Sequence, residues 1–109
     1  MSNESPTFSV VAPVYNESGS LMEFYRRASS VLQSTGESWE LILIDDGSQD
    51  GSTEIIRQLA QDDEHVRPVI FARNFGHQIA VTAGLDYSRG KAVTIIDSDL
   101  QDPPEVILD

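Results

Sequence analysis

Four short apolar runs alternate with longer segments of helical periodicity, and this alternation constrains the fold more than any other feature of the chain. The runs are rich in β-branched residues and cover residues 8–14, 41–44, 66–71 and 92–96. β-Branched residues favour strands, and strands separated by helices of about 10–15 residues are typical of βαβ units with right-handed crossovers. We therefore predict an α/β fold with a mostly parallel sheet of about four strands.

Two amphipathic segments predict the first two helices. The first follows a capping box formed by Ser20 and Glu23 and ends near Gly36. Its apolar residues recur at helical spacing and should face the core: Leu21, Phe24, Ala28, Val31 and Leu32. Asp50 can cap the second helix, because its side chain can accept a hydrogen bond from the first turn. The inner face of that helix would carry Ile55, Ile56, Leu59 and Ala60.

Small residues dominate the third predicted helix, over residues 78–88, which should be closed by Gly90. Its inward-facing residues are predicted to be Ile79, Ala80, Ala83 and Leu85. Another helix is predicted to start at Pro103, shortly before the chain ends at Asp109. A sheet that stopped there would leave its fourth strand poorly covered. We therefore expect the sequence to be the N-terminal part of a longer protein.

Composition excludes several classes of function. The chain carries 7 Lys and Arg against 18 Asp and Glu, a formal net charge of −11, and such an acidic surface repels nucleic acid. The absence of cysteine excludes a disulfide framework and a thiolate metal site. No apolar stretch approaches the ~18 residues of a membrane span, so this chain is expected to be soluble. The glycine motifs of dinucleotide-binding and P-loop proteins are also missing.

Acidic residues follow three of the four predicted strands. Glu17 comes after the first strand, Asp45 and Asp46 after the second, and Asp97 and Asp99 after the fourth. In an open parallel sheet, ligands bind outside the carboxyl ends of the strands. Carboxylates that converge there repel one another, and Mg²⁺ or Mn²⁺ relieves the repulsion. The pattern therefore predicts a metal-dependent site for a phosphorylated ligand.

The acidic residues after the strands could also have a purely structural role. Asp45 and Asp46 precede Gly-Ser, which is ordinary turn and N-cap chemistry. Glu17 equally suits the first turn of a helix, whose N-terminus favours negative charge. Asp97 and Asp99 flank Ser98, and in strand geometry their side chains point the same way while the serine points elsewhere. Two such pairs in one βαβ array favour a functional site.

The segment 73–78, Arg-Asn-Phe-Gly-His-Gln, follows the third strand and precedes a helix. A helix N-terminus beside an arginine is a natural site for an anion such as a diphosphate. Arg73 is therefore a candidate nucleotide-sugar-binding residue, although an ion pair with a surface acid is an equally open interpretation. His77 is interpreted as a residue of the loop or the helix start.

Four ordered motifs resemble those of known enzymes. Segments 10–17, 44–52 and 96–105 together resemble family 2 glycosyltransferases of the GT-A fold. Segment 73–78, followed by 82–85, is similar to the polyprenyl-phosphate branch, which includes dolichol-phosphate mannose synthases. The resemblance implies a truncated, Rossmann-like, three-layer fold with three to four helices. It also implies metal-dependent, inverting transfer of a sugar from a UDP- or GDP-sugar to a polyprenyl phosphate.

The resemblance assigns roles to individual residues. Asp97, Asp99 and Gln101 match the metal ligands, for Mg²⁺ or Mn²⁺ that bridges the two phosphates of the donor. Ile44 and Asp46 match a base-recognition pair, in which the carboxylate would accept an N–H of uracil or guanine alike. The residues that match positions along the nucleotide sugar are Pro13, Tyr15, Glu17, Ile44, Asp46, Ile96, Asp97 and Ser98. No catalytic base is assigned, because a lipid phosphate acceptor is already an anion.

The resemblance also implies an organisation and a location. Residues 1–109 would form the nucleotide-sugar-binding half of a GT-A domain, which holds the donor and the metal and is inactive alone. The full-length protein would act in the cell envelope, on the cytoplasmic side of the membrane. An uncovered face of the sheet leads us to expect a homodimer as well.

Two other hypotheses remain open at this stage. A receiver-like signalling domain would use an acid pair and Mg²⁺ to accept a phosphoryl group on an aspartate. Such domains place the acid pair after the first strand and need a lysine near the end of a fifth, whereas here the only lysine, Lys91, precedes the fourth strand. The remaining hypothesis is a stable fold whose acidic edge binds nothing.

Overall fold

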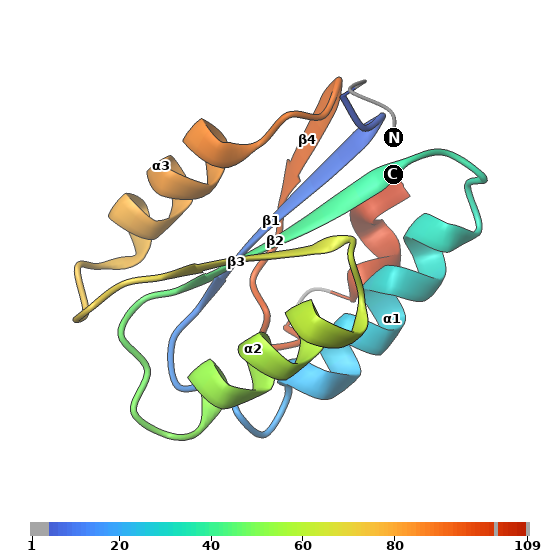
Figure 1. Ribbon diagram of the computed structural model, residues 1–109. Helices are drawn as coiled ribbons and strands as arrows, with labels where there is room; N and C mark the ends of the chain where they lie inside the picture. The colour runs from blue at the N-terminus through green and yellow to red at the C-terminus, as the bar shows by residue number, and fades with distance from the viewer. Residues whose placement is uncertain (1–4, 102, 109) are drawn as a thin grey trace.

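The computed structural model describes residues 5–101 and 103–108, in which strands and helices alternate along the chain. The strands are β1 (Phe8–Val14), β2 (Trp39–Asp45), β3 (Val66–Ile70) and β4 (Ala92–Ile95). The helices are α1 (Leu21–Gln33), α2 (Ser52–Asp62), α3 (His77–Tyr87) and the 3₁₀ helix η1 (Pro104–Leu108). Figure 1 shows α1, α2 and η1 on one face of the sheet and α3 on the other, so the predicted three-layer α/β architecture is confirmed.

All strand pairs are parallel, in the order β3-β2-β1-β4. The strands that precede the predicted acidic residues are therefore neighbours, with β1 between β2 and β4. Val14 at the end of β1 lies opposite Asp45 at the end of β2, and Val11 lies opposite Ile95 of β4. The carboxyl ends thus share one edge of the sheet, which we call the carboxyl edge.

The central strands are buried on both faces, as their continuous apolar sequences require. Val10 belongs to the larger core cluster, which α1 and α2 cover with the side chains predicted to face inward, Phe24 and Leu32 among them. Val11 belongs to the smaller cluster on the opposite face, where it packs with Ala80 of α3. The sheet is therefore held by hydrophobic packing on two sides.

The prediction of the inner face of α3 is wrong for its two large residues. Ile79 and Leu85 are 51% and 43% exposed, whereas Ala80 and Gly84 are buried against the sheet. A Cβ placed on Gly84 would lie 2.2 Å from Cγ1 of Val11. The helix therefore approaches the sheet through its smallest side chains, and this close approach turns the larger ones outward.

The predicted helix starts also differ in detail from the structure. Ser20 stands at the N-cap position of α1 but makes no capping hydrogen bond, because its hydroxyl lies 2.9 Å from the carbonyl oxygen of Ser98. Gly51 with φ 99° occupies the N-cap position of α2, and Asp50 accepts a hydrogen bond from the Ser52 N–H at 3.1 Å. The last predicted helix is the 3₁₀ helix η1.

The outer strands carry the exposed part of the sheet. Val93 and Ile95 of β4 are 40% and 46% exposed, which agrees with the predicted poor cover of the fourth strand. Pro68 lies in β3, an edge strand, where a missing N–H is tolerated. Among the described residues, no helix has the combined length and apolar character that a membrane crossing requires.

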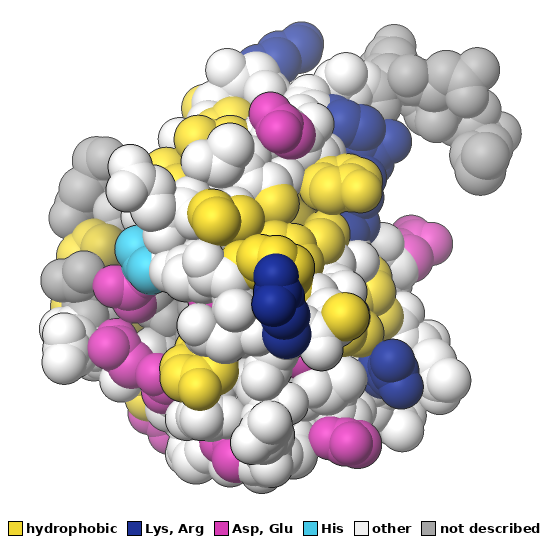
Figure 2. Space-filling model, turned by 90° about the vertical axis from the view of Figure 1, so that its left-hand side faces the viewer, with side chains coloured by type: hydrophobic (Ala, Val, Ile, Leu, Met, Phe, Trp, Pro, Cys, Tyr) yellow, Lys and Arg dark blue, Asp and Glu magenta, His cyan; other side chains and the backbone are white. Residues whose placement is uncertain are grey.

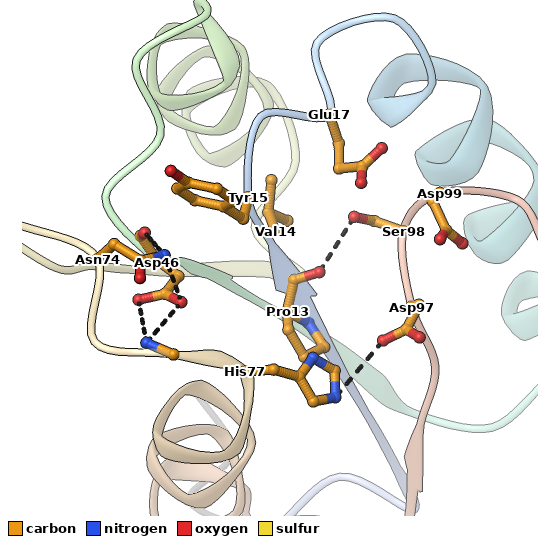
Figure 3. Close-up of a pocket in the computed structure, with 11 residues that line it drawn as sticks. Pro13, Val14, Tyr15, Glu17, Asp46, Asn74, His77, Asp97, Ser98 and Asp99 are labelled. Carbon is orange, nitrogen blue, oxygen red and sulfur yellow. Dashed lines mark hydrogen bonds and ion pairs between the residues drawn. The ribbon is translucent and has the colours of Figure 1, made fainter.

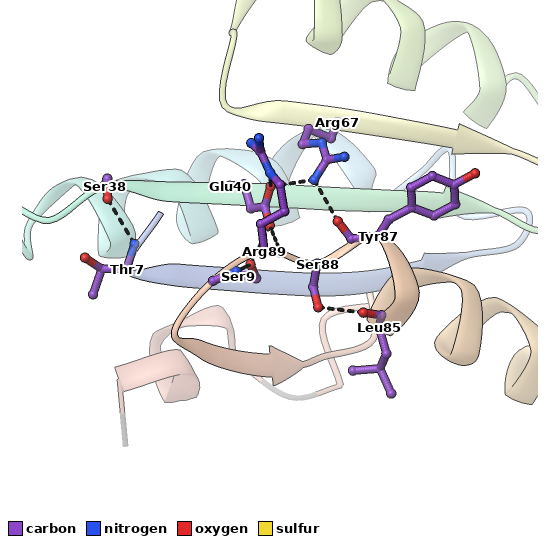
Figure 4. A network of polar contacts seen from close by, with 10 residues as sticks. Thr7, Ser9, Ser38, Glu40, Arg67, Leu85, Tyr87, Ser88 and Arg89 are labelled. Carbon is purple, nitrogen blue, oxygen red and sulfur yellow. Dashed lines mark hydrogen bonds and ion pairs between the residues drawn. The ribbon is translucent and has the colours of Figure 1, made fainter. Parts of the chain in front are cut away.

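A polar network at the opposite edge of the sheet ties α3 and β4 to the two central strands (Figure 4). The carboxylate of Glu40 is buried and accepts hydrogen bonds from Ser9 Oγ at 2.5 Å, Arg67 Nη1 at 2.7 Å and the backbone N–H of Arg89 at 2.7 Å. Ser9 Oγ in turn accepts the N–H of Gly90. Burial favours a raised pKa for Glu40, but the hydrogen bonds and the charge of Arg67 outweigh it and hold the pKa below its ordinary value.

The close approach of α3 predicts the effect of a larger side chain at Gly84. Gly84→Val should lower the free energy of unfolding by about 2 kcal/mol, because the added methyl groups overlap Val11 and Ile44. Thr82→Val on the exposed side of the same helix should change it by less than about 0.5 kcal/mol. Urea denaturation of both variants checks the prediction, and equal stabilities would contradict it.

The lowered pKa of Glu40 predicts a pH-dependent contribution to stability. Glu40→Gln should cost about 2 kcal/mol at pH 7, because it weakens hydrogen bonds to a buried charge. The ionised form is favoured by folding, so the difference between wild type and variant should be complete above the ordinary pKa of 4.5 and be lost progressively as the pH falls from there through the lowered pKa of the folded state. Denaturation at several pH values measures this, with the exposed Glu54→Gln as control. A difference that does not depend on pH would contradict the assignment.

Candidate functional site

A pocket of about 390 Å³ lies at the carboxyl edge of the sheet (Figure 3). Its wall is built from the ends of β1, β2 and β4 and from the loop that leads into α3. The lining residues are Pro13, Val14, Tyr15, Glu17, Asp46, Asn74, Gly76, His77, Asp97, Ser98 and Asp99. The pocket therefore forms where the parallel strands end, which is where the sequence predicted a site.

Most of the predicted site residues line this pocket, and four do not. Ile44 is fully buried in the core beneath α3, and Ile96 is 4% exposed in the core on the other face. Arg73 lies outside the lining, with its guanidinium carbon 4.7 Å from the centre of the Phe75 ring. Gln101 is exposed beside the pocket, and its N–H donates to Asp99 Oδ1 at 3.1 Å.

Asp45, the last residue of β2, and Asp46, which follows it, lie in two different surroundings. Asp45 is fully buried and faces the first turn of α2, where its carboxylate accepts hydrogen bonds from the N–H of Ser48 and the hydroxyl of Thr53. Asp46 lies on the pocket side, only 3% exposed. The expectation that Asp45 converges with the other acids is therefore wrong, because consecutive residues of an extended chain point in opposite directions.

Hydrogen bonds from the next loop already occupy the Asp46 carboxylate. Phe75 N donates to Oδ1 at 2.7 Å, and Gly76 N and Asn74 Nδ2 each donate to Oδ2 at 3.0 Å. Figure 3 shows Asn74 beside Asp46 at this side of the pocket. Asp46 thus joins the end of β2 to the loop that leads into α3.

Reciprocal hydrogen bonds position the loop that carries the pocket residues Tyr15 and Glu17. Asn16, which adopts a left-handed conformation with φ 54°, donates its N–H to Ser48 Oγ and accepts the N–H of Gln49, both at 2.9 Å. The N–H of Glu17 donates to the buried Ser52 Oγ at 3.0 Å. The loops after β1 and β2 therefore hold each other in place.

The segment after β4 presents two carboxylates to the pocket and turns the residue between them inward. Ser98 is 1% exposed, and its hydroxyl donates to the carbonyl oxygen of Pro13 at 3.1 Å. Asp97 and Asp99 both line the pocket. The Nε2 atom of His77 lies 3.8 Å from Oδ1 of Asp97, and Figure 3 shows the two side chains pointing toward each other.

The pocket carries strong negative charge. Four of its lining residues are acids, Glu17, Asp46, Asp97 and Asp99, and none of the described lining residues is Lys or Arg. Such a pocket repels an anionic diphosphate unless a cation accompanies it. Among residues 5–101 and 103–108, no group of three or more His, Cys, Asp or Glu side chains is arranged to hold a metal. The predicted ligand set differs in composition, since it combines two carboxylates with an amide, and these hard oxygen donors suit Mg²⁺ or Mn²⁺.

The face next to the pocket is more apolar. Figure 2 shows hydrophobic side chains gathered across the middle of this view, with acidic side chains beside them. Ile70, Phe75 and Ile79 are exposed hydrophobic residues of β3, the following loop and α3. An exposed apolar surface therefore lies next to the acidic pocket.

Four lining residues were not among the predicted site residues: Val14, Asn74, Gly76 and His77. Asn74 and Gly76 belong to the segment interpreted as an anion site, and the signal that could have found them is their position between a strand and a helix. Their contact with Asp46 joins residues 28 and 30 positions apart. Nothing in the local sequence pattern indicates such a contact.

Solved structures of glycosyltransferases share this fold. A mannosyltransferase from Pyrobaculum calidifontis, solved in complex with GDP-Man and Mn²⁺, matches with a TM-score of 0.73 and 22% identity, over 89% of this chain and 28% of that protein. TarS of S. aureus (residues 1–349), in complex with UDP-GlcNAc, matches with a TM-score of 0.72 and 21% identity, over 85% and 26%. These likenesses show the GT-A fold.

Two curated relatives are similar in sequence. An uncharacterized glycosyltransferase, YkcC, of Bacillus subtilis (strain 168) is 51% identical over 102 residues, which cover 94% of this chain. An undecaprenyl-phosphate 4-deoxy-4-formamido-L-arabinose transferase of Salmonella paratyphi B is 44% identical over 100 residues, which cover 91% of this chain. The matches cover 32% and 31% of the relatives, so the chain spans about a third of their length.

The family match extends over nearly all of the chain and includes every segment that lines the pocket. Residues 9–109 match the model of glycosyl transferase family 2. The chain belongs to glycosyl transferase family 2.

Proposed function

We propose that this chain is the donor-binding part of a metal-dependent, inverting glycosyltransferase that transfers a sugar from a UDP- or GDP-sugar to a polyprenyl phosphate. The observation that carries the proposal is the acidic pocket at the carboxyl edge of a family 2 chain. The printed names of the similar proteins support it, since one acts on undecaprenyl phosphate and others were solved with GDP-Man and Mn²⁺ or with UDP-GlcNAc.

Asp97 and Asp99, with Gln101 beside them, would hold Mg²⁺ or Mn²⁺, which supplies Lewis-acid stabilisation of the charge on a departing nucleoside diphosphate. Pro13, Tyr15 and Glu17 would line the nucleotide, on a loop that is locked to the loop after β2. The buried Ser98 keeps the two aspartates on the pocket side through its hydrogen bond to Pro13.

The reaction of the acceptor requires no general base from these residues. A polyprenyl phosphate is an anion that attacks without a general base, so none of the pocket acids needs to remove a proton. Attack from the face opposite the diphosphate would invert the anomeric centre. With a membrane lipid as acceptor, the whole protein would act at the membrane, and we propose that it does so on the cytoplasmic side.

The curated relatives are about three times as long as this chain, and this difference affects the activity that we expect of the chain alone. The chain spans about a third of each curated relative. We propose that it binds the donor but transfers little or no sugar alone.

The receiver-like alternative finds less support in the geometry. Phosphoryl transfer to an aspartate would need the acid pair to act at one site. Asp45 is instead buried against α2 with both carboxylate oxygens hydrogen bonded, while Asp46 lies at the pocket.

The proposal predicts metal-dependent nucleotide binding. UDP or GDP should bind the chain with Mn²⁺ present, and Asp97→Asn and Asp99→Asn should each weaken this binding at least about tenfold, because even partners of metal ligands contribute that much. Asp86→Asn, an exposed acid of α3, should leave binding unchanged. Calorimetric titration measures all of these affinities. Binding that is equal with and without Mn²⁺, or that survives both substitutions, would contradict the proposal.

A further inference from the structure

The segment after β4 that carries Asp97 and Asp99 is held by hydrogen bonds to two different elements. We propose that Ser20, at the start of α1, is a positioning residue. By donating its hydroxyl to the backbone carbonyl of Ser98, it keeps the two aspartates in place at the pocket. This inference deepens the proposed function: the role of the two acids as metal ligands rests on that function, whereas the positioning does not.

The first argument is the direction of the Ser20 side chain. A serine at the N-cap position of a helix ordinarily accepts a hydrogen bond from an N–H of the first turn, but Ser20 makes no such bond. Its Oγ instead lies 2.9 Å from the carbonyl oxygen of Ser98, 78 residues away in the sequence. The hydroxyl therefore contacts the pocket segment and not its own helix.

A hydroxyl has a single proton, and other acceptors also lie near Ser20. Oε2 of Glu17 is at 3.2 Å and the carbonyl oxygen of Glu17 at 3.5 Å, both farther away than the carbonyl oxygen of Ser98. Hydrogen bonds between oxygen atoms are usually about 2.7–2.8 Å long. The Ser98 carbonyl is therefore the best acceptor of the three.

β1 holds Ser98 from the other side. The Ser98 hydroxyl is buried and donates to the carbonyl oxygen of Pro13 at 3.1 Å (Figure 3). Just before it, the N–H of Ile96 donates to the carbonyl oxygen of Val11 at 3.0 Å. The side chain of Ser98 is thus fixed by β1 and its carbonyl group by α1, so the residue between the two aspartates is held from two elements.

The second argument is independent of these hydrogen bonds and comes from the backbone of Leu100. Leu100 has φ 66°, a left-handed conformation that is sterically unfavourable for a residue with a Cβ. Its side chain packs against the larger core cluster, and the N–H of Gln101 donates to Asp99 Oδ1 at 3.1 Å. A strained backbone persists only where its surroundings determine it. The segment therefore needs contacts such as that of Ser20 to keep its shape.

α1 contacts the same stretch of chain a second time, farther along the helix. Arg27 and Glu105 form a bidentate pair, with Nη2 to Oε1 at 2.6 Å and Nε to Oε2 at 3.1 Å. Glu105 belongs to η1, whose Ile107 lies in the larger core cluster. The helix thus contacts the chain both before and after residues 99–101, and Ser20 is the one of these two α1 contacts that reaches the segment between the pocket aspartates.

The proposed metal site gives this positioning a purpose. Two carboxylates that share one cation must keep a fixed separation, and Mg²⁺ in particular demands near-ideal geometry. Asp97 and Asp99 are joined only through Ser98, so their separation depends on the backbone of that residue. A contact that orients metal ligands from outside is typically worth tenfold or more in metal affinity.

¹⁵N relaxation by NMR, on the chain without ligand, tests the positioning. In the wild type the amides of residues 97–101 should be ordered, with order parameters of about 0.85. Ser20→Ala should lower them toward the range below about 0.6 that marks flexible backbone, whereas Ser20→Thr, which keeps the hydroxyl, should leave them unchanged. Ser29→Ala is the matched control and should also leave them unchanged, because its hydroxyl bonds to the Arg26 carbonyl within α1.

The same measurement separates positioning from helix capping. If Ser20 only capped α1, Ser20→Ala would loosen the amides of Met22 and Glu23 in the first turn and leave residues 97–101 ordered. That result would overturn the proposal, and so would order parameters at residues 97–101 that equal those of the wild type throughout.

Titration of UDP and of GDP in the presence of Mn²⁺ tests the consequence for the metal site. Ser20→Ala should weaken the binding of both nucleotides at least about tenfold, and Ser20→Thr should restore it. A loosened segment with unchanged affinities would overturn the claim that Ser20 serves the metal ligands. If the wild-type chain binds neither nucleotide, the proposed function fails, while the relaxation experiment still decides whether Ser20 positions the segment.

Discussion

The parallel pairing of β1 with both β2 and β4 is the constraint on which the rest of the structure depends. It places β1 in the centre, buries it on both faces and brings three strand ends to one edge. The helices follow from this arrangement, because each face of the central strands needs apolar cover. The pocket follows as well, since the residues after the three strands have no position except around the same edge.

The acids of the chain differ in how the structure compensates their charge. Glu40 is paired with arginines at the edge opposite the pocket, and Asp45 and Asp46 are held by N–H and hydroxyl donors. Within the described residues, Asp97 has only the distant ring of His77, and Asp99 accepts one backbone N–H. The Glu17 carboxylate likewise has only the Ser20 hydroxyl of the described chain as a hydrogen-bond donor, at 3.2 Å, so three of the four pocket acids have little compensation for their charge, which is compatible with the role proposed for Asp97 and Asp99. The acids whose charge is compensated hold the neighbouring strands and loops together.

Sequence reasoning predicted what depends on local pattern. Strand and helix periodicity predicted the parallel sheet, and the acids after the strands predicted the edge at which the pocket lies. It failed where tertiary contacts decide: Ser20 bonds to Ser98 instead of capping α1, and Gly84 turns Ile79 outward by letting α3 approach Val11. The anchoring of residues 73–76 by Asp46 was missed for the same reason, because a contact between distant segments has no signature in the spacing of either one.

We propose that the carboxyl edge of the sheet binds a nucleotide together with a divalent cation. Paramagnetic broadening of amide signals by Mn²⁺, in the presence of UDP or GDP, tests it residue by residue. The signals of Tyr15 and Ser98 should broaden first, while those of Ser38 and Arg89, at the opposite edge of the sheet, should stay sharp. Broadening centred on the opposite edge, or spread evenly over the exposed acids of the surface, would contradict it.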